Sequence, residues 1–193
     1  MFGYALKAFD FLKVQYPNTG DNLRSLLYIL PCILATVFCS IFALIDHSSA
    51  AGVNIFNHKA FDNISTFVQI LPGFYIGSLA AIASYNYPPM DNVMSLPAPF
   101  LKEQVEGGFR ESKLSRRRYL TLLFGYLSAI SILSAVFIFI VRLIYDVNIF
   151  AVPTMFYNIV YYVTAFLFFF IFWQMIVVTL FGIYYLADRM HRP

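Results

Sequence analysis

Long stretches without a charged residue alternate with short polar segments along the whole chain. A helix that crosses a lipid bilayer needs about 20 predominantly apolar residues. Four stretches are long enough, and the predicted spans are 25–45, 64–86, 119–141 and 155–186. The pattern therefore predicts an all-α membrane protein with four transmembrane helices.

The distribution of basic residues predicts how these helices are oriented. Of the 13 Lys and Arg residues, only Lys59 and Arg142 fall in the connections 46–62 and 142–154. Lys and Arg concentrate on the cytoplasmic side of membrane proteins. We therefore expect both termini and the 87–118 loop to be cytoplasmic. The expected organisation is an interfacial segment over 1–22 and a transmembrane domain over 23–193.

The N-terminal segment carries an apolar stripe at helical spacing. The stripe consists of Phe2, Ala5, Leu6, Phe9, Leu12 and Tyr16, with charged residues off it. This pattern predicts a short amphipathic helix on the inner membrane surface, and packing on a partner protein is the alternative. The polar residues before the first span also argue against a cleavable signal peptide.

The 87–118 loop is the longest polar connection. Its prolines predict an extended first half, Phe100–Glu106 is expected to form about two helical turns, and the end of the loop is basic. The basic run is typical of a topology anchor on anionic lipid, and docking of a cytoplasmic protein is the other interpretation. Four acidic residues in the loop argue against direct nucleic-acid binding. The candidate partner-binding residues are Phe100, Lys102, Arg110, Lys113, Arg116, Arg117 and Arg118.

Small residues recur at helical spacing in two of the spans. They are Gly73, Gly77 and Ala81 in the second span and Gly125 and Ala129 in the third. Such stripes allow membrane helices to approach closely. They predict packing within one chain or, alternatively, a seam between copies in a homo-oligomer.

The composition narrows the range of functions. Hydrophobic residues make up 60% and charged residues 12% of the chain, which excludes a disordered protein and an ordinary soluble domain. No Asp, Glu, Lys, Arg or His residue lies near the middle of a span, which argues against ion pumps and proton-coupled transporters. No catalytic motif appears. The outer-loop residues His47 and His58 are too far apart to suggest a metal site. We expect no enzyme, no cofactor and no metal.

The design of the chain resembles the KwaA family, the membrane subunits of Kiwa bacterial anti-phage defence systems. The resemblance rests on the length, the four spans, the basic Pro-rich loop, the opening 1–7 (MFGYALK) and the loop sequence 96–100 (LPAPF). It implies a non-enzymatic subunit of the bacterial inner membrane that forms a homo-oligomer, with a tetramer compatible with that design. It also implies a cytoplasmic, DNA-binding partner similar to KwaB.

Two functions follow as hypotheses. The first is a membrane sensor and scaffold that oligomerises, contacts membrane lipids and recruits a cytoplasmic effector protein in anti-phage defence. The alternative is a pore-forming effector or channel in the inner membrane. Such a pore could be lined by Ser128, Ser131 and Ser134 of the third span or by Gln174 of the fourth.

Overall fold

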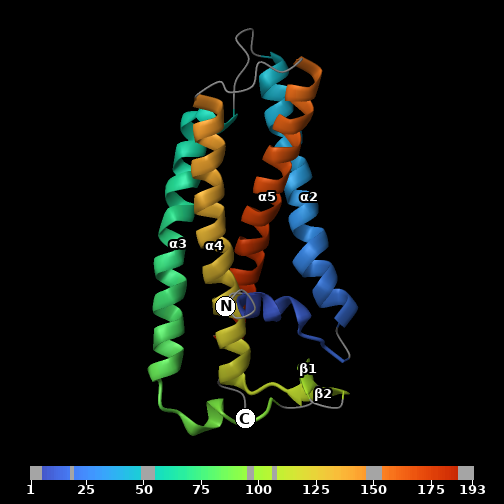
Figure 1. The fold of residues 1–193 in the computed structure, drawn as a ribbon, viewed down its shortest axis with the longest axis vertical. Coiled ribbons are helices and arrows are strands. Elements are labelled where there is room, and N and C mark those ends of the chain that lie inside the picture. Colours follow the sequence, from blue (N-terminus) through green and yellow to red (C-terminus); the bar gives the residue numbers. More distant parts are fainter. Residues whose placement is uncertain are drawn as a thin grey trace. The chain divides into compact units, whose positions relative to one another are not determined.

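The computed structural model describes residues 6–17, 20–48, 55–94, 98–105, 108–146 and 154–186 (Figure 1). Its helices and strands are, in chain order, η1 (Leu6–Lys13), α2 (Gly20–Ser48), η2 (Ile55–Asn57), α3 (Lys59–Ser84), η3 (Pro88–Met90), β1 (Phe100–Val105), β2 (Gly108–Lys113), α4 (Arg116–Asp146) and α5 (Thr154–Tyr184). The elements η1, η2 and η3 are short 3-10 helices.

The four long helices confirm the predicted all-α membrane protein. Their parts that are apolar and long enough to cross a bilayer are Ser25–Ile45, Lys59–Ser84, Arg116–Ile144 and Tyr157–Tyr184. The first span has the predicted bounds, whereas the second and third begin five and three residues earlier than the sequence pattern indicates. These added turns contain the charged residues Lys59, Asp62 and 116–118, because a helix continues into the interfacial region beyond the hydrocarbon core. The orientation of the spans stays a prediction.

The chain divides into two compact units. We call Met1–Ser25, Pro72–Ala129 and Val178–Pro193 the loop unit, and Leu26–Leu71 and Ile130–Val177 the helix unit. All four long helices, α2, α3, α4 and α5, contribute residues to both units.

Aromatic side chains form the core of the helix unit. The ring of Phe168 in α5 lies 5.1 Å from that of Phe61 in α3, and Phe169 stacks on Phe42 of α2 at 5.6 Å. Phe61, Phe168 and Phe169 are buried. Aromatic pairs at such distances contribute about 0.5–1.5 kcal/mol beyond the burial of their surface. The Phe-rich sequence of α5 therefore packs much of its surface on protein rather than on lipid.

One ion pair links α3 and α4 within the helix unit. Arg142 Nη2 donates to Asp62 Oδ1 at 2.5 Å, and the guanidinium lies over the ring of Phe61 at 5.3 Å. Both ionic side chains are partly exposed. The two elements are thereby joined close to the start of α3, where both charges can stay hydrated.

The loop unit contains a β-hairpin where the sequence predicted a helix. The prediction of helical turns over Phe100–Glu106 is wrong, because β1 pairs in an antiparallel register with β2. The register places Lys102 opposite Glu111 and Glu103 opposite Arg110. Opposite charges on directly facing residues favour strand pairing over a short isolated helix.

The N-terminal segment packs on its own chain. A short helix over part of the predicted stripe is confirmed as η1, while Phe2 and Ala5 lie outside the described residues. The buried residues are Phe11 and Val14, which the predicted stripe did not include. Phe11 stacks on Tyr126 of α4 at 5.6 Å. This apolar side of the segment therefore faces α4, whereas Leu12 is exposed.

Candidate partner-binding surface

The hairpin is joined by backbone hydrogen bonds to the rest of the loop unit. Gln15 N donates to Phe100 O at 2.9 Å and Phe100 N donates to Gln15 O at 3.0 Å, so the N-terminal segment pairs with β1. Leu114 N donates to Pro99 O at 3.0 Å, and Leu101 is buried. The base of the hairpin is therefore fixed at both of its strands.

The two faces of the hairpin separate the candidate residues. Residues directly opposite in an antiparallel pair share one face, and the faces alternate along each strand. Phe100, Lys102, Glu111 and Lys113 lie on one face, which we call the lysine face. Lys102, Glu111 and Lys113 are exposed there and Phe100 is half-buried. Arg110 is also exposed but lies on the opposite face.

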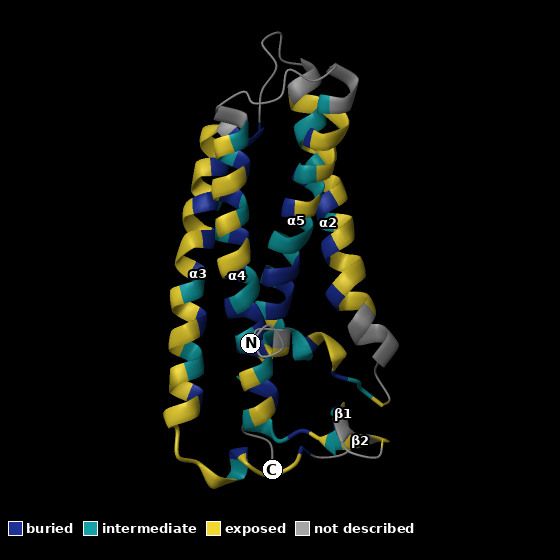
Figure 2. Ribbon diagram, in the orientation of Figure 1, coloured by how far each residue is buried: buried dark blue, intermediate teal, exposed yellow. Residues whose placement is uncertain are grey.

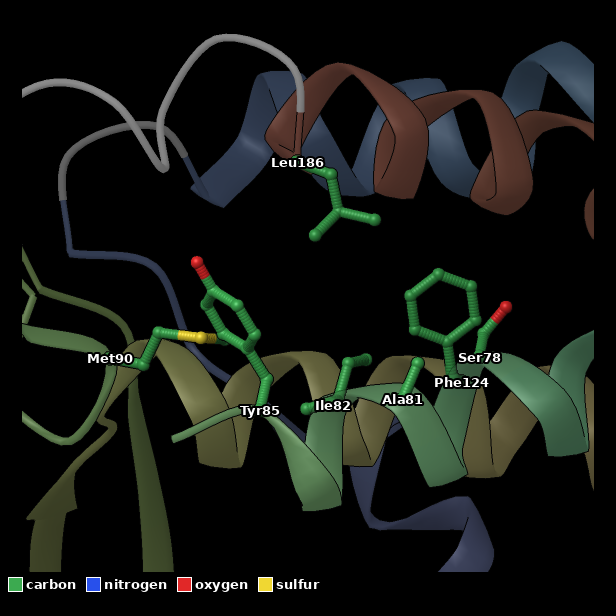
Figure 3. A pocket seen from close by; sticks show the side chains of 7 residues that line it. All are labelled: Ser78, Ala81, Ile82, Tyr85, Met90, Phe124 and Leu186. Atoms are coloured by element: carbon green, nitrogen blue, oxygen red, sulfur yellow. The ribbon is translucent and has the colours of Figure 1, made fainter. Parts of the chain in front are cut away.

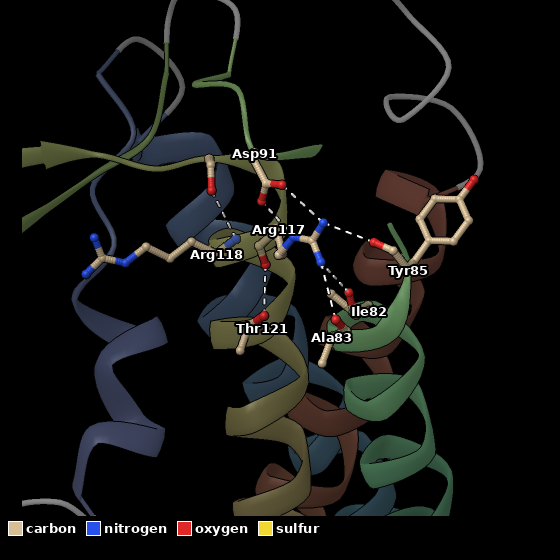
Figure 4. A network of polar contacts seen from close by, with 8 residues as sticks. Ile82, Ala83, Tyr85, Asp91, Arg117, Arg118 and Thr121 are labelled. Carbon is tan, nitrogen blue, oxygen red and sulfur yellow. Dashed lines mark hydrogen bonds and ion pairs between the residues drawn. The ribbon is translucent and has the colours of Figure 1, made fainter. Parts of the chain in front are cut away.

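Arg117 is held by other residues of the loop unit. Its Nη1 donates to Ile82 O at 3.1 Å and to Ala83 O at 3.4 Å, and its Nη2 donates to Tyr85 O at 3.0 Å. The Nε and Nη2 atoms donate to the carboxylate of Asp91 at 2.7 and 3.2 Å (Figure 4). Ile82 and Ala83 belong to the last turn of α3, whose carbonyl groups lack partners within the helix. Arg117 therefore caps the end of α3 through these contacts, and its role on a partner surface stays a prediction.

The neighbouring arginines have different surroundings. Arg116 is half-buried at the start of α4. Arg118 is exposed, and its Nη1 donates to Ser112 Oγ of β2 at 3.2 Å. Ser115 Oγ accepts a hydrogen bond from the backbone N of Arg118 at 3.3 Å, as expected for an N-cap residue. The three consecutive arginines therefore differ: Arg116 and Arg117 are half-buried, and Arg118 is exposed.

An aromatic cluster lies beneath the hairpin in the loop unit. The hydroxyl groups of Tyr16 and Tyr119 are 2.8 Å apart, and the rings of Tyr119 and Tyr185 are 5.1 Å apart. The Tyr185 hydroxyl donates to Met94 Sδ at 3.1 Å. The N-terminal segment, the loop, α4 and the turn after α5 meet in this cluster, which sequence reasoning did not identify.

The predicted small-residue stripe of α3 is exposed in the chain. At Gly73 and Gly77, a Cβ atom would meet no other atom within 4 Å, and Ala81 is exposed. Much of the surface of α3 is exposed (Figure 2). The structure therefore shows no close packing contact at Gly73 or Gly77, and packing of the stripe within the chain stays a prediction. A seam between copies stays a prediction.

The stripe of α4 is half-buried. Gly125 and Ala129 are intermediate in exposure, and a Cβ atom on Gly125 would also meet nothing within 4 Å. Close helix approach instead occurs at Gly182 of α5, where a Cβ atom would lie 3.0 Å from Leu123 Cδ2. The sequence signal for Gly182 is only a lone glycine in an aromatic helix.

The polar residues suggested as a pore lining are buried within the chain. Ser128, Ser131, Ser134 and Gln174 are all buried. Ser134 Oγ donates to Ile130 O at 2.7 Å, as serines in membrane helices commonly do. A pore lined by these residues in an oligomer stays a prediction.

The side chains described here show no group of three His, Cys, Asp or Glu residues with metal-ligand geometry. His58 Nδ1 accepts a hydrogen bond from Ala60 N at 3.1 Å, and Asp62 is paired with Arg142. Cys32 and Cys39 are free thiols in α2. These groups therefore have structural surroundings typical of helix ends and apolar spans.

Comparison with protein-family models, curated proteins and solved structures finds no match to this chain.

Proposed function

We propose that the chain is a non-enzymatic subunit of a bacterial inner membrane that acts as a sensor and scaffold. In this proposal it forms a homo-oligomer and recruits a cytoplasmic effector protein, in the manner of a KwaA-like subunit with its KwaB-like, DNA-binding partner in anti-phage defence. The observation that carries the proposal is the anchored hairpin over 100–113, which presents exposed charged residues outside the four spans.

In this proposal, the lysine face is the surface that binds the effector protein. Lys102 and Lys113 are exposed on it, with Glu111 as the exposed acidic residue that faces Lys102. An acidic patch on a partner would be attracted to the two ammonium groups, and charge complementarity of this kind mainly sets specificity and association rate. The hairpin is anchored by backbone hydrogen bonds, so little ordering cost accompanies binding.

The position of the hairpin also suits a sensor. Its base pairs with the N-terminal segment, and that segment packs on α4 through Phe11. A change in the loop-unit part of α4 would therefore reach the hairpin through continuous contacts. In this proposal, membrane disturbance shifts the helices and alters the lysine face.

The test is recovery of partners from the native host in mild detergent, followed by mass spectrometry. Lys102→Glu and Lys113→Glu should each reduce recovery of a stoichiometric soluble partner about tenfold, a loss near 1.4 kcal/mol. Lys59→Glu is the matched control, because Lys59 is an exposed lysine at the start of α3. Arg110→Glu tests the opposite face of the same hairpin.

Each outcome has a definite meaning. Equal recovery from all variants would refute recruitment through the lysine face. Loss with Arg110→Glu alone would move the contact to the opposite face. A pure homo-oligomer that conducts ions in reconstituted vesicles would replace the scaffold with the alternative, a pore-forming effector.

A further inference from the structure

An apolar groove of about 430 Å³ lies within the loop unit (Figure 3). Ser78, Ala81 and Tyr85 come from α3 and its end, Phe124 comes from α4, and Leu186 follows α5. None of the lining residues is charged. Ser78 Oγ donates to Phe74 O at 2.9 Å, so that hydroxyl is already satisfied within the helix. The groove therefore suits an apolar occupant, since water needs two to four polar partners in a cavity.

The sequence of α3 explains why the groove exists. Phe74, Ser78, Ala81 and Tyr85 are spaced by four, three and four residues and so form one stripe of the helix. Phe74 is 53% exposed and Tyr85 is 52% exposed. The two small side chains between these rings leave the hollow. The groove thus opens on an outward-facing stripe of α3 rather than into a closed core.

The surroundings of the groove indicate what covers this stripe. Ser78 and Ala81 lie within the last two turns of the span Lys59–Ser84. Phe74 and Ile76, large apolar residues of the same span, are exposed, so in a bilayer their surroundings are acyl chains. Polar structure begins at the end of the same helix, where Arg117 binds the Ile82 carbonyl and the carboxylate of Asp91. The groove therefore lies on the hydrocarbon side of the boundary with the polar region.

We propose that the groove is a binding site for one acyl chain of a bilayer phospholipid. A lipid whose headgroup lies at the level of Arg117 can extend a chain along α3, between the rings of Phe74 and Tyr85. The volume is within the range of about 300–1,000 Å³ that is typical of small-molecule sites. The bound chain covers apolar surface of α3, α4 and the turn after α5 at once, and so stabilises the contacts among these three elements. This proposal does not depend on the proposed recruitment of an effector.

The test uses the full chain in nanodiscs that contain phosphatidylcholine with a photoreactive diazirine on one acyl chain. Cross-linked peptides are then mapped by mass spectrometry. We expect labelling to be enriched at the 78–85 stretch and Met90 over the exposed apolar residues of α2. Ala81→Phe fills the groove and should reduce this labelling about tenfold, equivalent to about 1.4 kcal/mol of lost binding. Ala80→Phe is the matched control, because Ala80 is an exposed neighbour that does not line the groove.

Three results would overturn the proposal. The first is uniform labelling of all exposed apolar faces. The second is an equal loss of labelling in Ala81→Phe and Ala80→Phe. The third is cross-linking of a photoreactive residue at Tyr85 to a second copy of the chain, which would make the groove a subunit contact. If Ala81→Phe does not elute as a folded species, Ser78→Leu fills the same groove with a smaller side chain and carries the test.

Discussion

The contact between Arg117 and the end of α3 allows a quantitative prediction. The perturbation is Arg117→Ala, which removes five hydrogen bonds to three carbonyl groups and one carboxylate. The Arg117 side chain is 24% exposed, whereas that of Asp91 is 60% exposed. The hydrogen bond to Ile82 O is partly buried, and the loss of a hydrogen bond to a charged group costs about 1.5–3 kcal/mol.

The other contributions of Arg117 are smaller. A positive charge at a helix C-terminus contributes about 0.3–1 kcal/mol, and an ion pair as exposed as that with Asp91 contributes about 0–1 kcal/mol. Because these groups are partly exposed, we take the low end of the ranges for the hydrogen bond, the helix dipole and the ion pair. We therefore expect Arg117→Ala to lower the free energy of opening the loop after α3 by about 2 kcal/mol. A change of that size raises the population of the open state roughly 30-fold.

Hydrogen–deuterium exchange of the purified chain in mild detergent measures this opening locally. The reporting amides are those of Tyr85, Met90 and Asp91, each of which donates to a backbone carbonyl within 3.0 Å. Their exchange should accelerate about 30-fold in Arg117→Ala, since exchange follows the open population. Arg118→Ala is the matched control, because the Arg118 guanidinium reaches Ser112 of β2.

A second variant separates the contributions. Asp91→Asn keeps the carbonyl contacts of Arg117 and removes only the charge of an exposed carboxylate, so its exchange should accelerate about fivefold or less. Unchanged exchange of these amides in Arg117→Ala would refute the capping role. Equal effects of Arg117→Ala and Asp91→Asn would show that the ion pair, and not the carbonyl contacts, provides the stability.

Two other predictions follow from contacts in the loop unit. Gly182→Val should destabilise the chain by about 1–3 kcal/mol through overpacking, measured as a lower temperature for loss of the monodisperse peak in detergent. Gly77→Val meets open space and should leave that temperature nearly unchanged, and equal losses would contradict the close approach at Gly182. Tyr16→Phe and Tyr119→Phe each remove one hydroxyl of a pair 2.8 Å apart and should each cost about 0.5–1.5 kcal/mol in amide protection of the N-terminal segment. The double variant should cost little more than either single one, and additive effects would show that the two hydroxyl groups act independently.

The four spans could be predicted from the sequence because a bilayer imposes a length and an apolar composition on each helix. The hairpin was not predicted because apolar and polar residues do not alternate regularly in its strands. The sequence of Phe100–Val105 is equally compatible with a short helix. The signal that could have identified it is the complementary order of charges, with Lys102 and Glu103 facing Glu111 and Arg110 in the hairpin register. Such a signal depends on knowing where the turn falls.

The role of Arg117 was missed for a different reason. The three consecutive residues of the basic run are all arginine, so their side chains are chemically identical. Only their positions relative to the packed face of α4 distinguish them. Arg117 lies three residues before Leu120 and seven before Phe124, both buried, so it falls on the packed stripe. The sequence shows apolar residues around most of α4 and therefore does not reveal which stripe is packed. Which residues line the groove depends in the same way on tertiary contacts among three elements.

The contact between Tyr16 and Tyr119 has a consequence for the order of assembly during synthesis. The two residues are 103 positions apart, so at roughly 5–20 residues per second the N-terminal segment leaves the ribosome about 5–20 s before its partner in α4. Phe100, the backbone partner of Gln15, is also made after α2 and α3. The N-terminal segment therefore docks only after α2, α3 and the beginning of α4 have been made. A bulky fusion placed before it would interfere with this last step rather than with membrane insertion of the early helices.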